Sequence, residues 1–163
     1  MTPAELIRES PAILLVEENP DDAKLVIRSF KKQRVANMVH HVTGGGEALD
    51  YLFRQGAYAD PEKSPRPHMI LLDLRLPRMD GLEVLKVIKS SDELASIPVV
   101  VLSTSASERD ATQAYEDSEN SYVVKPLDSQ TFTQLMDGLG YYWLAWNFVP
   151  WRNGPERPET GPA

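Results

Sequence analysis

One short stretch, residues 69–81, constrains the fold of this chain more than any other. It begins with an apolar run, residues 69–72, ends that run on Asp73, and turns through Pro77 and Gly81 into a helical pattern. A short apolar run is typical of a strand buried on both faces, as in a parallel sheet. An acid at the carboxyl end of such a strand lies where open α/β sheets bind their ligands. We therefore expect a parallel sheet whose functional edge includes Asp73.

The rest of the chain repeats the order of strand followed by helix. Further strands are predicted at residues 12–16, 37–42, 97–102 and 122–124. Helical patterns follow every strand, and the last two cover residues 108–116 and 128–146. This alternation predicts an α/β fold with a parallel sheet and helices on both faces. Five such pairs joined by right-handed crossovers fit a flavodoxin-like (βα)5 doubly wound sheet of strand order 2-1-3-4-5.

Local signals indicate where the helices begin and end. Asn19 and Asp128 are predicted to cap helices, and the acids at residues 21–22 fall in a first turn, where the helix dipole favours negative charge. Gly56 is predicted to stop the helix that begins near residue 48. The polar, proline-containing segment 57–67 is expected to form an exposed loop.

Composition excludes several classes of function. The 163 residues suffice for one domain, and a net charge of -7 argues against binding nucleic acid through a basic surface. The absence of cysteine excludes a disulfide scaffold, a thiol nucleophile and a cysteine-ligated metal. No apolar run approaches the ~20 residues that span a bilayer. Residues 1–10 lack the apolar core of a secretory signal, so we expect a cytoplasmic protein.

The predicted domain organisation is simple. Residues 1–10 are expected to form an N-terminal arm, residues 11–146 the domain, and residues 147–163 a tail rich in proline, glycine and charge. We expect no second domain.

Polar side chains follow four of the predicted strands. Glu17 and Glu18 follow the first strand, Asp73 ends the third, Ser103 ends the fourth, and Lys125 ends the fifth. In this topology these strand ends meet at one edge of the sheet. Three carboxylates placed together repel one another unless a cation lies among them. A hard, oxygen-liganded divalent ion resolves this, and Mg2+ typically takes one or two carboxylates and completes its shell with water and a phosphoryl group.

The same edge suits phosphoryl transfer to a carboxylate. An aspartate oxygen that attacks phosphorus forms an acyl phosphate, which is a known form of covalent chemistry. Such a transfer needs positioning and charge neutralisation above all. The ammonium of Lys125 and the hydroxyl of Ser103 can supply both to the phosphoryl oxygens. Asp73 is therefore the predicted acceptor.

Four blocks of sequence resemble those of the receiver domains of two-component response regulators. They are residues 16–22 (VEENPDD), 72–81 (LDLRLPRMDG), 101–104 (VLST) and 122–126 (YVVKP). The resemblance covers residues 11–140 and implies a signalling protein rather than an enzyme.

The resemblance also assigns roles to individual residues. It implies that Asp73 is the phosphorylated aspartate and that Lys125 is the lysine that receiver domains place beside it. It also implies that Ser103 is the switch hydroxyl and Tyr122 the switch aromatic residue. It further implies a cis peptide before Pro126. In such a protein the face built from segments 108–116, 122–124 and 128–146 carries the signal.

The implied metal site has one irregular member. The resemblance implies that Mg2+ is held by Glu17, Glu18, Asp73 and the backbone carbonyl of Arg75, but the family's second acid is normally aspartate. The extra methylene of Glu18 moves its carboxylate about 1 Å outward, and Mg2+ tolerates little distortion of its octahedron. A receiver-like interaction module that carries no phosphate is therefore an alternative. An aspartyl-phosphate phosphatase is disfavoured, because those enzymes place a second acid where this chain has Arg75.

Partners follow from the same resemblance. A sensor histidine kinase is the expected phosphodonor. The polar loop 57–67 and the aromatic segment 141–146 resemble single-domain regulators that partner bacteriophytochrome-type kinases. That aromatic segment carries more apolar surface than one helix face buries, so we also expect a homodimer.

Overall fold

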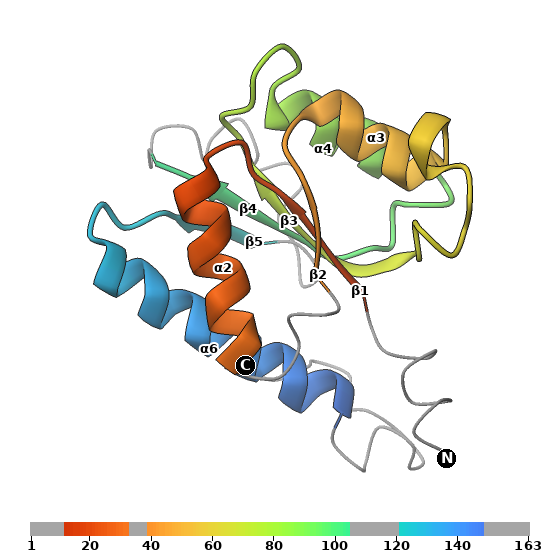
Figure 1. The fold of residues 1–163 in the computed structure, drawn as a ribbon. Coiled ribbons are helices and arrows are strands. Elements are labelled where there is room, and N and C mark those ends of the chain that lie inside the picture. Colours follow the sequence, from red (N-terminus) through yellow and green to blue (C-terminus); the bar gives the residue numbers. More distant parts are fainter. Residues whose placement is uncertain (1–11, 33–38, 105–120, 149–163) are drawn as a thin grey trace.

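A five-stranded parallel sheet forms the centre of the molecule. The structure is a computed structural model, and it describes residues 12–32, 39–104 and 121–148. The strands are β1 (Ala12–Val16), β2 (Val39–Val42), β3 (Pro67–Asp73), β4 (Val99–Ser103) and β5 (Ser121–Val124). Their order across the sheet is β2-β1-β3-β4-β5, and all four pairings are parallel (Figure 1). The predicted fold class and strand order are confirmed.

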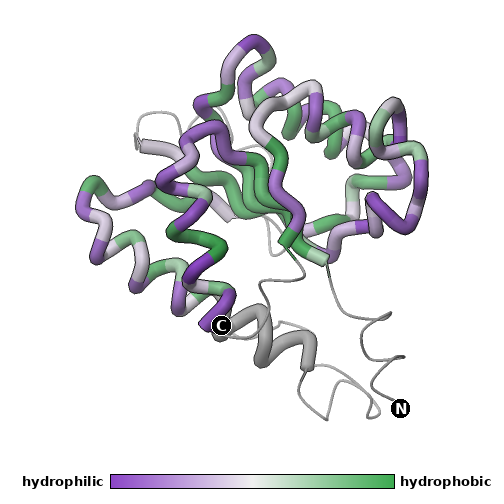
Figure 2. Tube along the Cα trace, in the orientation of Figure 1, coloured by the Kyte–Doolittle hydropathy of each residue, from purple (hydrophilic) through white to green (hydrophobic). Residues whose placement is uncertain are grey.

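Helices cover both faces of this sheet. The helices α2 (Pro20–Lys32) and α6 (Ser129–Phe148) pack side by side on one face, while α3 (Gly45–Phe53) and α4 (Gly81–Ser90) cover the other (Figure 1). Two separate apolar clusters lie between the helices and the sheet. Figure 2 shows hydrophobic residues gathered in the central strands, while hydrophobic and hydrophilic residues alternate along the helices. The arrangement is the three-layer solution expected when a parallel sheet must be covered on both faces.

The central strands are buried along their whole length. Every residue of β1 and β4 is buried, and in β3 only His68 is exposed. Successive side chains of a strand point to opposite faces. Leu14 accordingly belongs to the cluster beneath α3 and α4, whereas Leu15 belongs to the cluster beneath α2 and α6. Continuous apolar runs are thus the sequence signature of strands with two covered faces.

Side chains cap three of the helices, and two of these caps, Asn19 and Asp128, were predicted. Asn19 Oδ1 accepts hydrogen bonds from the backbone N–H groups of residues 21 and 22, and Asp128 accepts from those of residues 130 and 131. Asp80 caps α4 by accepting from the N–H of Glu83 at 2.9 Å. Each cap satisfies backbone donors that have no partner inside the helix. These caps fix where the helices leave the sheet edge.

The segment after α3 differs from the prediction. The helix ends at Phe53 rather than at Gly56, and Arg54 takes the left-handed position with φ 55°. Its Nε donates to the carbonyl of Ser64, which compensates for the unfavourable backbone conformation. The loop predicted as exposed contains the short helix η2 (Gly56–Tyr58) and a fully buried Ser64. The hydroxyl of Tyr51 donates to the carbonyl of Pro65 and ties this loop to α3.

Other boundaries shift by one or two residues. Strand β4 begins at Val99, after Pro98, whose nitrogen has no hydrogen to donate to a ladder. Helix α6 continues to Phe148, two residues past its predicted end. Among the described residues no peptide bond is cis, so the expected cis peptide before Pro126 is wrong. Trans is the isomer that most X–Pro bonds adopt.

Several predictions fall on residues outside the description. These are the N-terminal arm 1–10, the helix 108–116, the end of the tail 149–163 and the side chains of the aromatic segment 141–146. Within the part of the chain that is described, no helix combines the length and apolar character needed to cross a membrane.

Candidate functional site

Hydrogen bonds between strand ends build the platform of the site. The N–H of Glu17 donates to the carbonyl of Val42, that of Leu74 to Leu102, and that of Lys125 to Ser103. These bonds continue the parallel ladders one residue beyond the strands. The side chains that follow β1, β3 and β5 are therefore held at one edge, as the strand order requires.

Asp73 lies at the centre of this edge. It is the last residue of β3 and only 5% exposed. Its Oδ1 accepts the backbone N–H of Arg75 at 2.9 Å, and its Oδ2 accepts from the ammonium of Lys125 at 3.1 Å. The two hydrogen bonds fix the plane of the carboxylate from opposite sides. An acceptor held in this way loses little rotamer freedom when it reacts.

Lys125 joins three carboxylates. Its Nζ donates to Glu17, to Asp22 at 3.0 Å and to Asp73 at 3.1 Å. An ammonium group has three hydrogens, so these partners use all of its donors. Glu17 and Asp73 were expected here, whereas Asp22 was predicted only to favour the helix dipole. The sequence signal for Asp22 was its place in the first turn of α2, immediately after the loop that carries Glu17.

Burial shapes the electrostatics of the cluster. Burial and the adjacent Asp73 raise the pKa of Glu17 to about 8, against the lowering effect of Lys125. Burial alone would lower the pKa of Lys125, but its hydrogen bond to Glu17 and the charge of Asp73 outweigh this and raise it. Lys125 is thus a permanent cation at neutral pH. The cluster nevertheless holds more negative charge than one ammonium offsets.

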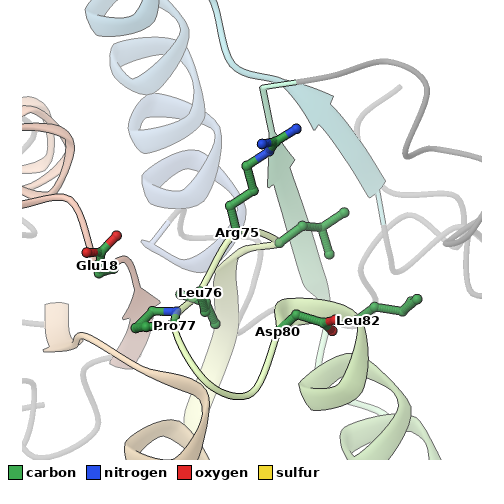
Figure 3. Close-up of a pocket in the computed structure, with 7 residues that line it drawn as sticks. Glu18, Arg75, Leu76, Pro77, Asp80 and Leu82 are labelled. Atoms are coloured by element: carbon green, nitrogen blue, oxygen red, sulfur yellow. The ribbon is translucent and has the colours of Figure 1, made fainter.

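Glu18 lies apart from this cluster. Its side chain is exposed and lines an open cleft of about 650 Å3. The other walls of the cleft come from the loop between β3 and α4 and from the first turn of that helix (Figure 3). They are formed by Leu74, Arg75, Leu76, Pro77, Asp80 and Leu82. Glu18 therefore faces the same loop as the other predicted ligands, but it shares no hydrogen bond with Glu17 or Asp73 among those found in the described residues.

Ser103 and Tyr122 lie on the neighbouring strands. Ser103 is fully buried at the end of β4, where it pairs in register with Val124. Tyr122 is half-buried on β5 and pairs with Val101. Ser103 follows Leu102, the register partner of Asp73, so it lies one step beyond the acceptor on the next strand. The five predicted side chains thus share one edge, and hydrogen bonds join Lys125 to Glu17 and to Asp73.

The donor set fits a hard divalent cation. Glu17 and Asp73 offer buried carboxylate oxygens, and the pKa of Glu17 is raised first by burial and then by the neighbouring Asp73. A hard cation beside both groups would favour their ionised forms. In the described part of the chain, no three acidic or histidine side chains are already grouped at metal-binding spacing. Lys125 holds the carboxylates instead. Each of these carboxylates binds the ammonium through one oxygen, while the other oxygen accepts a backbone N–H, that of Asn19 for Glu17 and that of Arg75 for Asp73. A bound cation would compete with these donors for the carboxylate oxygens.

Comparison with known proteins gives a family match over most of the chain. The model of the response regulator receiver domain matches residues 13–137. A probable methanogenesis regulatory protein, FilR2 of Methanothrix harundinacea, is 42% identical over 85% of this chain and 86% of its own length. The response regulator Rcp1 of Synechocystis is 40% identical over 81% of this chain and 88% of its own.

Solved structures agree with this match. The phosphorylated cyanobacterial phytochrome response regulator RcpA superposes with a TM-score of 0.76 at 37% identity, covering 86% of this chain and 98% of RcpA. The Mn(2+)-bound form of Rcp1 superposes with a TM-score of 0.73 at 36% identity, covering 86% of this chain and 99% of Rcp1.

Proposed function

The chain belongs to the response regulator receiver domain family, and we propose that it is a stand-alone regulator that accepts a phosphoryl group on Asp73. The observation that carries this proposal is the contact between the buried Asp73 carboxylate and the ammonium of Lys125, 3.1 Å apart at the carboxyl edge of the sheet. A buried acid with a fixed cation beside it is the arrangement that phosphoryl transfer to a carboxylate needs.

In the proposed reaction an oxygen of Asp73 attacks the phosphorus of a phosphohistidine. The new bond joins Asp73 Oδ to phosphorus, the phosphorus–nitrogen bond breaks, and the departing imidazole takes up a proton. Lys125 stays beside the developing negative charge and donates to a phosphoryl oxygen. The N–H of Arg75, 2.9 Å from Asp73 Oδ1, keeps the carboxylate oriented. Ser103 donates its hydroxyl to another phosphoryl oxygen.

We propose that Mg2+ is required and is held by Glu17, Glu18, Asp73 and the carbonyl of Arg75. The cation would supply charge neutralisation for the phosphoryl oxygens that Lys125 does not reach. The Mn(2+)-bound form of the relative Rcp1 supports a divalent cation in a protein of this kind. As a proposed ligand, Glu17 offers a buried carboxylate at the end of β1.

The signal is proposed to leave the site through β4 and β5. Phosphorylation adds negative charge and acceptor oxygens, which bias a surface that has two states. Ser103 moves toward the phosphoryl group and Tyr122 repacks behind it. The backbone bond from Lys125 N–H to the carbonyl of Ser103 supports this route, because it joins the two strand ends. The surface that responds is formed by segments 108–116 and 121–124 and by α6.

The proposed partners are a sensor histidine kinase and a second copy of the chain. Likeness to RcpA, a phytochrome response regulator, supports a bacteriophytochrome-type kinase. The aromatic residues at 141–146 support a homodimer through the signalling face, which sedimentation over a concentration series tests. A monomer at every concentration would contradict it. We place the protein in the cytoplasm, where such kinases present their phosphohistidine, and expect binding neither to nucleic acid nor to membranes.

Intact-mass spectrometry tests the acceptor. The protein is incubated with acetyl phosphate and Mg2+, and the gain of one phosphoryl group is expected. Asp73→Asn should abolish the gain, because an amide oxygen is a poor nucleophile toward phosphorus. Asp50→Asn, which changes an exposed acid on α3, is the matched control and should keep it. Labelling that persists in Asp73→Asn would contradict the proposed acceptor, and chelation of Mg2+ tests the metal.

The second candidate is an interaction module that carries no phosphate. The observation that favours it is the position of Glu18, which is exposed and separate from the cluster around Lys125. Such a module would take no phosphoryl group from any small donor or kinase. It would still bind its partner equally well after Asp73→Asn.

A further inference from the structure

Asp22 is a partner of Lys125 to which the sequence analysis assigns no role in the site. It lies in the first turn of α2, and its Oδ2 accepts from Lys125 Nζ at 3.0 Å. Its side chain is 32% exposed, while that of Lys125 is 6% exposed. Asp22 therefore reaches the ammonium from the solvent side, across from the buried Glu17 and Asp73.

The neighbouring residue shows that the helix dipole does not account for this contact. Asp21 lies in the same first turn, carries the same charge and is exposed. Both backbone N–H groups, of Asp21 and Asp22, bond the capping side chain of Asn19. Of these two acids, only Asp22 forms an ion pair with Lys125 among those found in the described residues. The two acids thus share their charge, their place in the first turn and their backbone bonds to Asn19, but only Asp22 is partly buried and contacts Lys125.

We propose that Asp22 is a positioning residue that holds the ammonium of Lys125 in place while the other two carboxylates change partners. This inference rests on the proposed phosphoryl acceptance at Asp73. Of the three acids bound to Lys125, Glu17 and Asp73 are the ones assigned to the metal and the phosphoryl group. Asp22 is the one that keeps its hydrogen bond to the ammonium throughout the reaction.

The geometry explains why such a holder is needed. Lys125 has a long, flexible side chain, and its ammonium binds as a point charge with no directional fork of its own. In the resting arrangement three carboxylates fix it from three sides. A cation and a phosphoryl group at Glu17 and Asp73 would compete with the ammonium for their oxygens, so these two restraints would weaken during the proposed reaction. The hydrogen bond that Lys125 donates to Asp22 fixes one N–H of the ammonium, which leaves the other two N–H groups for phosphoryl oxygens.

The test compares three variants of the full-length protein. Asp22→Asn removes the charge of the holder, Asp22→Glu restores a carboxylate on a longer stem, and Asp21→Asn is the matched control. Three quantities are measured: the rate of phosphoryl uptake from acetyl phosphate at saturating Mg2+, the Kd of Mg2+ by calorimetry, and the hydrogen exchange of the Lys125 ammonium by NMR with Mg2+ present.

The expected result separates Asp22 from Asp21. Asp22→Asn should slow phosphoryl uptake roughly three- to tenfold relative to Asp21→Asn, as loss of one charge-assisted hydrogen bond to a partly exposed group predicts. Exchange of the Lys125 ammonium should become faster, and Asp22→Glu should restore part of both. The Kd of Mg2+ should match that of Asp21→Asn.

Two results would overturn the inference. If Asp22→Asn equals Asp21→Asn in uptake and in ammonium exchange, Asp22 does not position Lys125. If Asp22→Asn weakens Mg2+ binding far more than Asp21→Asn does, Asp22 is a ligand of the metal. A wild-type protein that takes no phosphoryl group would refute the proposed function instead. In that case the ammonium exchange of the same variants still decides whether Asp22 holds Lys125.

Discussion

Gly81 ties the start of α4 to the acceptor, and its replacement by alanine gives the sharpest test of how the site is supported. Its N–H donates to the carbonyl of Leu74 at 2.9 Å. A Cβ added at Gly81 would lie 2.3 Å from the carbonyl oxygen of Asp73 and 2.6 Å from Cα of Leu74. Both atoms belong to backbone, so no side chain can rotate away. The φ angle of Gly81 is not positive, so close approach alone demands glycine here.

The magnitude follows from the overlap. Cβ contacts below 3.0 Å are essentially never seen, so the Asp73–Leu74 peptide and the helix must separate by the difference from 2.3 Å, about 0.7 Å. Overpacking of this kind costs about 1–3 kcal/mol. The helix propensity of alanine returns at most ~1 kcal/mol. Because a displacement of ~1 Å at a reacting group can cost 10²-fold, phosphoryl uptake should fall at least tenfold.

The assay for Gly81→Ala is urea unfolding followed by circular dichroism, together with phosphoryl uptake at a temperature where the variant is folded. Gly46→Ala is the control, because its added Cβ, also near a helix start, meets no atom within 4 Å. Gly46→Ala should match or slightly exceed the stability of the wild type and keep normal uptake. Equal stability and equal uptake in the two variants would refute the argument from close approach.

Three further predictions concern stability. Gly138→Ala, exposed in α6 with nothing within 4 Å of its added Cβ, should raise the free energy of unfolding by ~1 kcal/mol in urea titrations. Asp80→Ala should cost ~1 kcal/mol by removing the cap of α4, whereas Asp80→Asn should cost only a few tenths. Burial lowers the pKa of His40, so its protonation opposes folding and stability is lost as pH falls below its usual value near 6.5. The stability of the wild type relative to His40→Gln should therefore decrease between about pH 7.5 and pH 5.5, and a constant difference would contradict this.

The strands were predictable because burial on both faces leaves a local trace. The apolar run 12–16 coincides with β1, and the capping side chains of Asn19 and Asp128 mark the helix starts. The end of α3 was not predictable in this way. Both Arg54 (φ 55°) and Gly56 (φ 57°) are left-handed, but the helix already ends before Arg54, whose side chain bonds the carbonyl of Ser64, ten residues away. A contact between residues that far apart leaves no periodic pattern in the sequence, so it could not be predicted from the sequence.

The positions of the acidic residues differ from what the sequence pattern predicts. Position along the chain predicts that Glu17 and Glu18 act as a pair, but side chains adjacent in sequence leave the end of a strand in opposite directions. Glu17 therefore points into the buried cluster, where it meets Lys125, and Glu18 points out toward the cleft. Asp22 lies one helical turn further on and returns to the side of Glu17, which is why its carboxylate reaches Lys125 although its sequence position suggests only a helix start. The resting site thus holds Lys125 with one acid from a strand end, one from a helix and the acceptor itself. In the proposed phosphorylation Glu17 and Asp73 would exchange partners, and Asp22 is the acid that we propose keeps its hydrogen bond with the Lys125 ammonium.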